Sequence, residues 1–204
     1  MKICVTGILV LCVMANPLTA ADGPTILAAE VEAAVLSMFK AAPVELRSRI
    51  DQDETQRICS ETRNAPPAAQ AEAIKAREIA TIVYPDDGNV LGDWKKGEVV
   101  AQSGAGGQFS DAPGAVRGGN CYACHQMAAA ELSFGTLGPS LYGYGNARSF
   151  EASAAKAVYA KIFNAQSVQP CSSMPRFGYH KFLTIEQLRD VTAYLMSPDS
   201  PVNK

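Results

Sequence analysis

The sequence has little of what would place it among nucleic-acid-binding or membrane-spanning proteins. Its 204 residues carry 18 Lys and Arg against 20 Asp and Glu, so no strongly basic surface for nucleic acid is expected. Beyond the first residues, no segment approaches the ~20 consecutive apolar residues of a membrane-spanning helix. No convincing alternation of apolar and polar residues indicates strands. We therefore expect an all-α protein of one ordinary domain plus an extension.

The N-terminus has the features of an export signal. Lys2 gives a basic start, the apolar run 3–15 follows, and Pro17 with small residues leads to Ala20 and Ala21. This pattern predicts a signal peptide over residues 1–21 and a periplasmic protein without a membrane anchor. The alternative is a lipoprotein anchored at Cys12, but Leu11 is bulky where lipid-attachment sites need a small residue.

Four cysteines remain once the leader is removed, and two of them form a motif. Cys121-Tyr122-Ala123-Cys124-His125 matches the attachment site of a c-type haem, in which both thiols bond the porphyrin and the histidine ligates iron. The alternative is a zinc or dithiol site, but there is no second Cys-x-x-C pair, and His180 is isolated. The sequence predicts one covalent haem c.

Met174 is our candidate for the second axial ligand. A thioether favours ferrous iron, and the prolines of the segment 170–175 (Pro-Cys-Ser-Ser-Met-Pro) could hold the sulfur against it. His180 and Cys171 are rival ligands, and Met174 could also simply fill a gap in the core. The remaining methionines beyond the initiator are Met14 in the leader, Met38, Met127 and Met196.

Helical patterns surround these motifs. Asp93 can cap a helix from Trp94 to about Ala101, residues 151–164 form a second, and Thr184 with Gln187 forms a capping box for the last. The order of elements along the chain is that of class I cytochromes c: a first helix, the haem motif, middle helices, the methionine loop and a final helix. We assign residues 85–204 to this domain. Residues 22–84, with helical spacing at 31, 35 and 39 and at 76, 79 and 83, form a helical extension.

Further residues receive roles around the predicted haem. In such cytochromes a proline carbonyl accepts the second ring proton of the ligating histidine, and Pro139 in the segment 137–143 is our candidate, with a plain turn as the alternative. Arg176 could pair with a haem propionate or be an ordinary solvated arginine. Trp94 and Tyr194 are expected to pack between helices rather than carry electrons.

The two leftover cysteines suggest a cross-link. Cys59 lies in the extension and Cys171 lies just before Met174, and an oxidising compartment permits disulfides. We expect a Cys59–Cys171 disulfide that braces the ligand loop.

The segments 92–98, 104–111, 118–125, 136–145 and 174–178 together resemble SoxX, the small cytochrome subunit of the SoxAX complex in bacterial sulfur oxidation. The resemblance implies a periplasmic heterodimer with SoxA, a thiosulfotransferase in which SoxA holds the catalytic haem and thiosulfate is joined to a SoxYZ carrier cysteine. It also implies that Cys121 and Cys124 anchor the accepting haem, that His125 and Met174 are its axial ligands, and that a downstream cytochrome takes the electrons. No catalytic residue is expected in this chain itself, and a free-standing cytochrome shuttle is the alternative.

Overall fold

The computed structural model of the protein describes residues 27–41, 50–107, 111–112 and 114–204. The chain divides into two compact units, Met1–Asp51 and Gln52–Lys204. The predicted signal peptide, residues 1–21, lies outside the described residues. In the first unit, helix α1 (Ala28–Met38) has Leu27, Val31 and Phe39 on its surface.

The second unit is built from helices, and its described residues contain no strand, which confirms the all-α prediction. Its α-helices are α2 (Glu54–Glu61), α3 (Ala68–Ile79), α4 (Trp94–Gln102), α5 (Ala152–Phe163) and α6 (Ile185–Met196). Short 3-10 turns lie at η2 (Cys121–Ala123), η3 (Asn146–Arg148), η4 (Ala165–Ser167) and η5 (Pro201–Asn203). The three helices predicted around the motifs therefore form within two residues of the expected bounds.

Side-chain caps explain where these helices begin. Asp93 accepts a hydrogen bond from the Lys95 amide at the start of α4. Thr184 and Gln187 form the predicted reciprocal capping box at the start of α6. Each cap satisfies amide groups that the first turn of a helix leaves without a partner.

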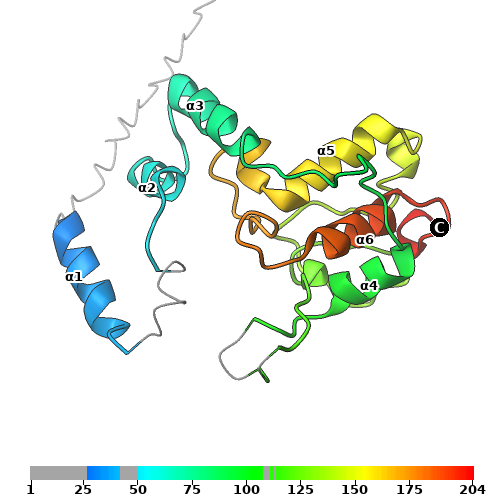
Figure 1. Ribbon diagram of the computed structural model, residues 1–204, viewed down its shortest axis with the longest axis horizontal. Helices are drawn as coiled ribbons and strands as arrows, with labels where there is room; N and C mark the ends of the chain where they lie inside the picture. Colours follow the sequence, from blue (N-terminus) through cyan, green and yellow to red (C-terminus); the bar gives the residue numbers. More distant parts are fainter. Residues whose placement is uncertain (1–26, 42–49, 108–110, 113) are drawn as a thin grey trace, which may run out of the picture. The chain divides into compact units, whose positions relative to one another are not determined.

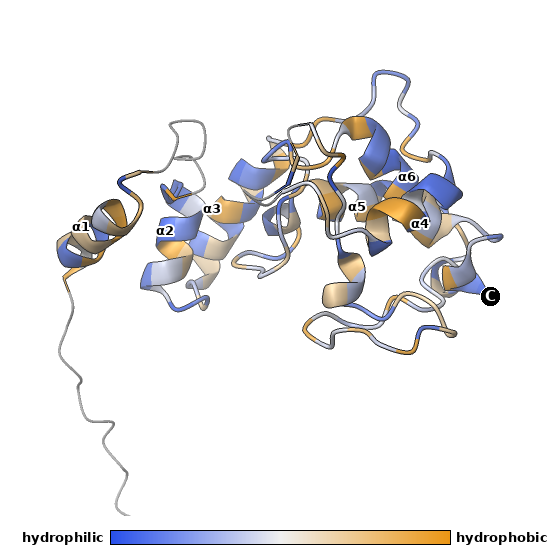
Figure 2. Cartoon of the chain, turned by 90° about the horizontal axis from the view of Figure 1, so that it is seen from below, coloured by the Kyte–Doolittle hydropathy of each residue, from blue (hydrophilic) through white to orange (hydrophobic). Residues whose placement is uncertain are grey.

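The crossing of α4 and α6 is the centre of the core (Figure 1). At Gly97 the backbone of α4 lies against the Asp190 carbonyl and the Tyr194 side chain, so a Cβ there would overlap α6. Asp190 in turn accepts a hydrogen bond from the Asp93 amide at 2.7 Å. Helix α5 packs on the other side of α6, and residues of α4, α5 and α6 form the buried apolar core (Figure 1). Figure 2 shows apolar and polar residues interspersed along these helices.

Residues 52–84 belong to the same compact unit as the cytochrome-like helices. Helix α3 packs against η4, and Tyr159 of α5 donates a hydrogen bond to the Val83 carbonyl at 2.9 Å. The domain boundary that we place after residue 84 remains a prediction, whereas the structure divides the chain after Asp51.

The apolar spacing read from the sequence does not mark the buried face of α3. Ile79 and Val83 are exposed, whereas Ile74 and Glu78 are buried. The helix ends at Ile79, so Val83 lies beyond it, and the face that packs inward includes a carboxylate with partners in the core.

Candidate haem site

The Cys-x-x-Cys-His segment folds as a tight turn rather than as a full helix. Asn120 has a left-handed backbone (φ 45°), and η2 follows from Cys121 to Ala123. The amides of Cys124 and His125 both donate to the Cys121 carbonyl, at 3.1 and 2.9 Å. Both cysteine side chains are half-buried and form no disulfide, so both thiols are free to bond a porphyrin.

Burial raises the pKa of the Cys121 thiol to about 12. The negative potential of the nearby Cys124 acts in the same direction. Cys121 is therefore a neutral thiol at neutral pH, the form that is least reactive toward oxidants.

The His125 ring is oriented by a backbone carbonyl. Its Nδ1 lies 2.7 Å from the Pro139 carbonyl oxygen. A carbonyl can only accept, so Nδ1 carries the proton and Nε2 keeps the lone pair that a metal needs.

The loop that carries Pro139 is tied to the haem motif. The Gly138 amide donates to the Cys124 carbonyl, and the Leu141 amide donates to the Gln126 carbonyl, both at 2.8 Å. A Cβ at Gly138 would overlap the His125 ring, so a side chain there would displace the imidazole. The loop therefore determines where the ring lies as well as its tautomer.

Met174 lies in the stretch between η4 and α6, a part of the chain without helix. Its side chain is half-buried and packs against the core, as do Cys121 and Phe177. The other described methionines differ: Met127 and Met196 are fully buried, and Met38 is 77% exposed in the first unit. The ligation of iron by Met174 remains a prediction.

The rival ligands have other partners. Cys171 forms a disulfide with Cys59, so its sulfur is not a free thiolate in this state. His180 lies edge-on against Tyr179 at the surface, and partial desolvation of its ring together with the Arg176 charge lowers its pKa.

Arg176 is buried, so it is not the ordinary solvated arginine that was one of the two roles considered from the sequence. The other role, a pair with a haem propionate, stays a prediction. The Arg176 side chain is 4% exposed, and its guanidinium contacts Asp53 Oδ2 at 2.5 Å and Glu78 Oε2 at 3.4 Å. Burial alone would raise the pKa of Asp53, but the Gln56 amide and the Arg176 guanidinium lower it below its ordinary value.

Sequence reasoning missed Asp53 and Glu78. The capping box of Asp53 with Gln56 at the start of α2 was a readable signal for one of them, although it gave no indication of Arg176.

Two tyrosines meet beneath the haem motif. The hydroxyls of Tyr122 and Tyr194 lie 2.6 Å apart, and burial raises the pKa of Tyr194 far above its ordinary range. Tyr194 is fully buried and Trp94 packs against the core, as expected for helix-packing residues. The pair joins η2 to α6 through one partly buried hydrogen bond.

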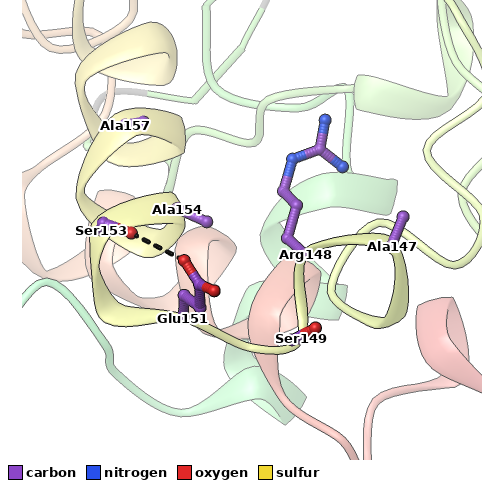
Figure 3. Close-up of a pocket in the computed structure, with 7 residues that line it drawn as sticks. All are labelled: Ala147, Arg148, Ser149, Glu151, Ser153, Ala154 and Ala157. Carbon is purple, nitrogen blue, oxygen red and sulfur yellow. Dashed lines mark hydrogen bonds between the residues drawn. The ribbon is translucent and has the colours of Figure 1, made fainter.

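A surface hollow lies away from these residues. It is lined by the turn around η3 and the first turns of α5, including Arg148, Glu151 and Ser153 (Figure 3). Ser153 Oγ donates to Glu151 Oε2 at 3.2 Å. Arg148 lies over the Tyr144 ring at 3.6 Å. None of the residues predicted to hold the haem lines it.

Comparison with known proteins agrees with this geometry. The cytochrome c family profile matches residues 105–198, a range that includes the Cys-x-x-Cys-His segment, Pro139 and Met174. The chain is also 43% identical over 155 residues to a protein of Aquifex aeolicus (strain VF5) described as an uncharacterized lipoprotein, covering 75% of this chain and 73% of that protein. Residues 105–198 therefore form a domain of the cytochrome c family.

In this cytochrome the site fits a covalent haem c. Two free thiols have the Cys-x-x-Cys spacing of haem attachment. The adjacent imidazole has the tautomer of an iron ligand, because its Nδ1–H donates to the Pro139 carbonyl and leaves Nε2 unprotonated. The helical fold, in which α4 before the haem motif crosses the last α-helix, α6, is that of a class I cytochrome c with a helical extension. Electron transfer is the activity that a cytochrome c domain supports.

Among the described residues of this cytochrome, none of the helices combines the length and the apolar character needed to cross a membrane.

Proposed function

We propose that this cytochrome is the monohaem subunit of a SoxAX-type complex. It accepts electrons from the SoxA haem while thiosulfate is coupled oxidatively to a cysteine of the carrier SoxYZ. The resemblance of five segments to SoxX supports this assignment, and the observation that carries it is the single attachment motif followed by the 174–178 segment, Met-Pro-Arg-Phe-Gly.

The roles of the residues follow from their chemistry. A haem c, when bound, supplies a one-electron iron couple. Cys121 and Cys124 hold it covalently, and His125 ligates through Nε2 because Pro139 accepts the proton on Nδ1. Met174 supplies the thioether that favours the reduced state. No residue of this chain needs to act as a nucleophile or as an acid or base, since an electron and no group is transferred.

The complex as a whole is then a thiosulfotransferase, and this chain is its electron-transfer subunit. SoxA is the stable partner, SoxYZ is a transient one, and a downstream cytochrome takes the electron. The nearly balanced charge of the sequence, 18 basic against 20 acidic residues, is compatible with protein partners and favours no nucleic acid.

We place the mature protein in the periplasm, with cleavage after residue 20 or 21. The Aquifex relative is described as a lipoprotein, and Cys12 is where a lipid would be attached here. The mass of the mature protein distinguishes the two routes. Loss of residues 1–20 or 1–21 supports release, whereas an acylated N-terminal Cys12, abolished by Cys12→Ser, would show an anchor.

The ligand assignment is tested by Met174→Ala. We expect a five-coordinate, high-spin ferric haem that binds added imidazole, with loss of the Met-to-iron charge-transfer band. Met127→Leu is the matched control because Met127 is fully buried, and its spectrum should stay that of the parent. An unchanged spectrum in the Met174 variant would retire Met174 as a ligand.

The subunit assignment is tested by purifying the tagged protein from its native periplasm and staining a denaturing gel for covalent haem. A second haem-bearing band in constant ratio, with haem reduction that requires both thiosulfate and SoxYZ, supports the SoxAX-type complex. A single haem band without such reduction would point instead to a free-standing electron shuttle.

A further inference from the structure

The segment 168–184 between η4 and α6, called the Met174 loop below, is linked to helices α2 and α3 on both sides of Met174. Cys171, before Met174, is bonded to Cys59 of α2. Arg176, after Met174, contacts Asp53 at the start of α2 and Glu78 at the end of α3. The loop itself contains no helix, so these distant partners supply much of what holds it.

Arg176 is buried and paired with carboxylates, unlike a cation at the protein surface. Its side chain is 4% exposed, its two terminal nitrogens contact different carboxylates, and its guanidinium lies 4.3 Å from the centre of the Tyr179 ring. A buried guanidinium needs paired carboxylates, because an unpaired buried charge is costly. The position of Arg176 is therefore set by Asp53 and Glu78.

Glu78 is fixed by several partners in addition to Arg176. Thr55 donates to its Oε1, and the Asn164 amide donates to its Oε2 at 2.7 Å. Glu78 is 3% exposed and Asn164 is fully buried. Arg77 lies 3.7 Å from the same carboxylate and 3.2 Å from Glu54 Oε2, so the linked ion pairs join two arginines to three acids.

We propose that Asp53 and Glu78 are positioning residues for the axial ligand, which hold the Met174 sulfur on the haem iron through Arg176. The proposal rests on the ligation by Met174 proposed above. A thioether is a weak ligand without charge, so its retention depends on how firmly its loop is held. Loosening Arg176 increases the fraction of time in which the sulfur leaves the iron and another ligand can enter.

Asp53→Asn is the most selective variant. Asn is as good an N-cap as Asp, so α2 keeps its cap while Arg176 loses one of its two charged partners. Glu78→Gln removes the second charge and keeps one acceptor oxygen, which can serve either Thr55 or Asn164 but not both. Asp87→Asn is the control for removing a carboxylate from a long-range pair elsewhere in the unit, because Asp87 contacts Arg189 at 3.2 Å at a more exposed site.

The measurement uses the purified mature haem protein with imidazole as the probe. We expect imidazole to bind the ferric form about fivefold faster in Asp53→Asn and about tenfold faster in Glu78→Gln. The Met-to-iron band should weaken and the reduction potential should fall in both variants. Asp87→Asn should match the parent in all three measurements. Arg176→Lys keeps the positive charge but cannot contact two carboxylates at once, so its values should lie between those of the parent and of Glu78→Gln.

The outcomes separate this proposal from the assignment of the ligand. Unchanged imidazole rates and potentials in both variants, while Met174→Ala binds imidazole, would overturn positioning and leave ligation standing. An equal increase in the Asp87→Asn control would show general loosening and would also overturn positioning. An unaltered Met174→Ala spectrum would overturn both proposals.

Discussion

Removal of the Cys59–Cys171 disulfide is expected to destabilise the cytochrome strongly. The bond joins residues separated by 112 positions, and Cys59 is buried on α2. The perturbation is the double variant Cys59→Ala/Cys171→Ala, which removes the cross-link and leaves no free thiol.

The magnitude follows from the length of the closed loop. In the chain-entropy relation, a loop of 112 residues reduces the entropy of the unfolded chain by an amount equivalent to about 5 kcal/mol at room temperature. The effect acts on the unfolded state and therefore adds to the Arg176 contacts, which stabilise the native loop. A typical native domain has only about 5 to 15 kcal/mol of stability, so this loss is a large share.

The assay is urea unfolding of the haem-loaded proteins, followed by far-ultraviolet circular dichroism. With a denaturant slope of about 2 kcal/mol per molar, the midpoint of the double variant should fall by about 2.5 M. The variant Ser60→Ala/Ser173→Ala serves as the matched control, because it changes neighbouring residues without removing a bond between them. It should stay within about 0.5 kcal/mol of the parent.

A midpoint for the cysteine variant within about 0.5 M of the parent would refute this reasoning. It would show that the unfolded chain is already compact in this region, or that the two sulfurs are not joined in the mature protein. Mass analysis of the unreduced parent, in which two free thiols would be visible, distinguishes these explanations.

Three further predictions concern the haem ligand, the helix crossing and pH. Gly138→Ala should displace the His125 ring and lower the yield of haem-loaded protein with a six-coordinate spectrum, measured by haem stain and absorption. Gly97→Ala should cost roughly 3 kcal/mol in urea unfolding, because its Cβ overlaps Asp190 of α6. Asp53→Asn should cost about 1 kcal/mol near neutral pH, a cost that disappears on acidification, as unfolding at a series of pH values would show.

Each of these predictions has its own contrary result. Gly88→Ala strains a backbone with φ 70°, but its Cβ meets nothing within 4 Å, so it should keep the parent haem spectrum. An equal loss in both glycine variants would reject ring displacement. Val99→Ala lies on the exposed face of α4, and a cost equal to that of Gly97→Ala would reject the close crossing.

The sign of the pH effect follows from the lowered pKa of Asp53. A carboxyl whose pKa is lower in the folded state than in the unfolded state stabilises the fold at pH values above its ordinary pKa of about 3.9. This stabilisation is lost as the pH falls through the pKa of the folded state. If the difference in unfolding free energy between Asp53→Asn and the parent grew as the pH was lowered, this assignment of the sign would be contradicted.

Much of this site was readable from the sequence because its signals are local. The Cys-x-x-Cys-His segment and the capping box at Thr184 each span a few residues, and short spacing determines which groups meet. Helix bounds around the haem motif followed from the same kind of information. The assignment of an all-α cytochrome c fold needed little more.

Tertiary structure alone decided what Arg176 does. Asp53 and Glu78 lie 123 and 98 residues before it in the chain, and no local pattern couples charges so far apart. The apolar spacing at Ile79 suggested the wrong face of α3, because the inward face carries Glu78 to meet a buried guanidinium. Apolar periodicity predicts which residues are buried by the hydrophobic effect. It does not predict a buried ion pair, because the partner charge lies far away in the sequence and comes close only in the folded chain.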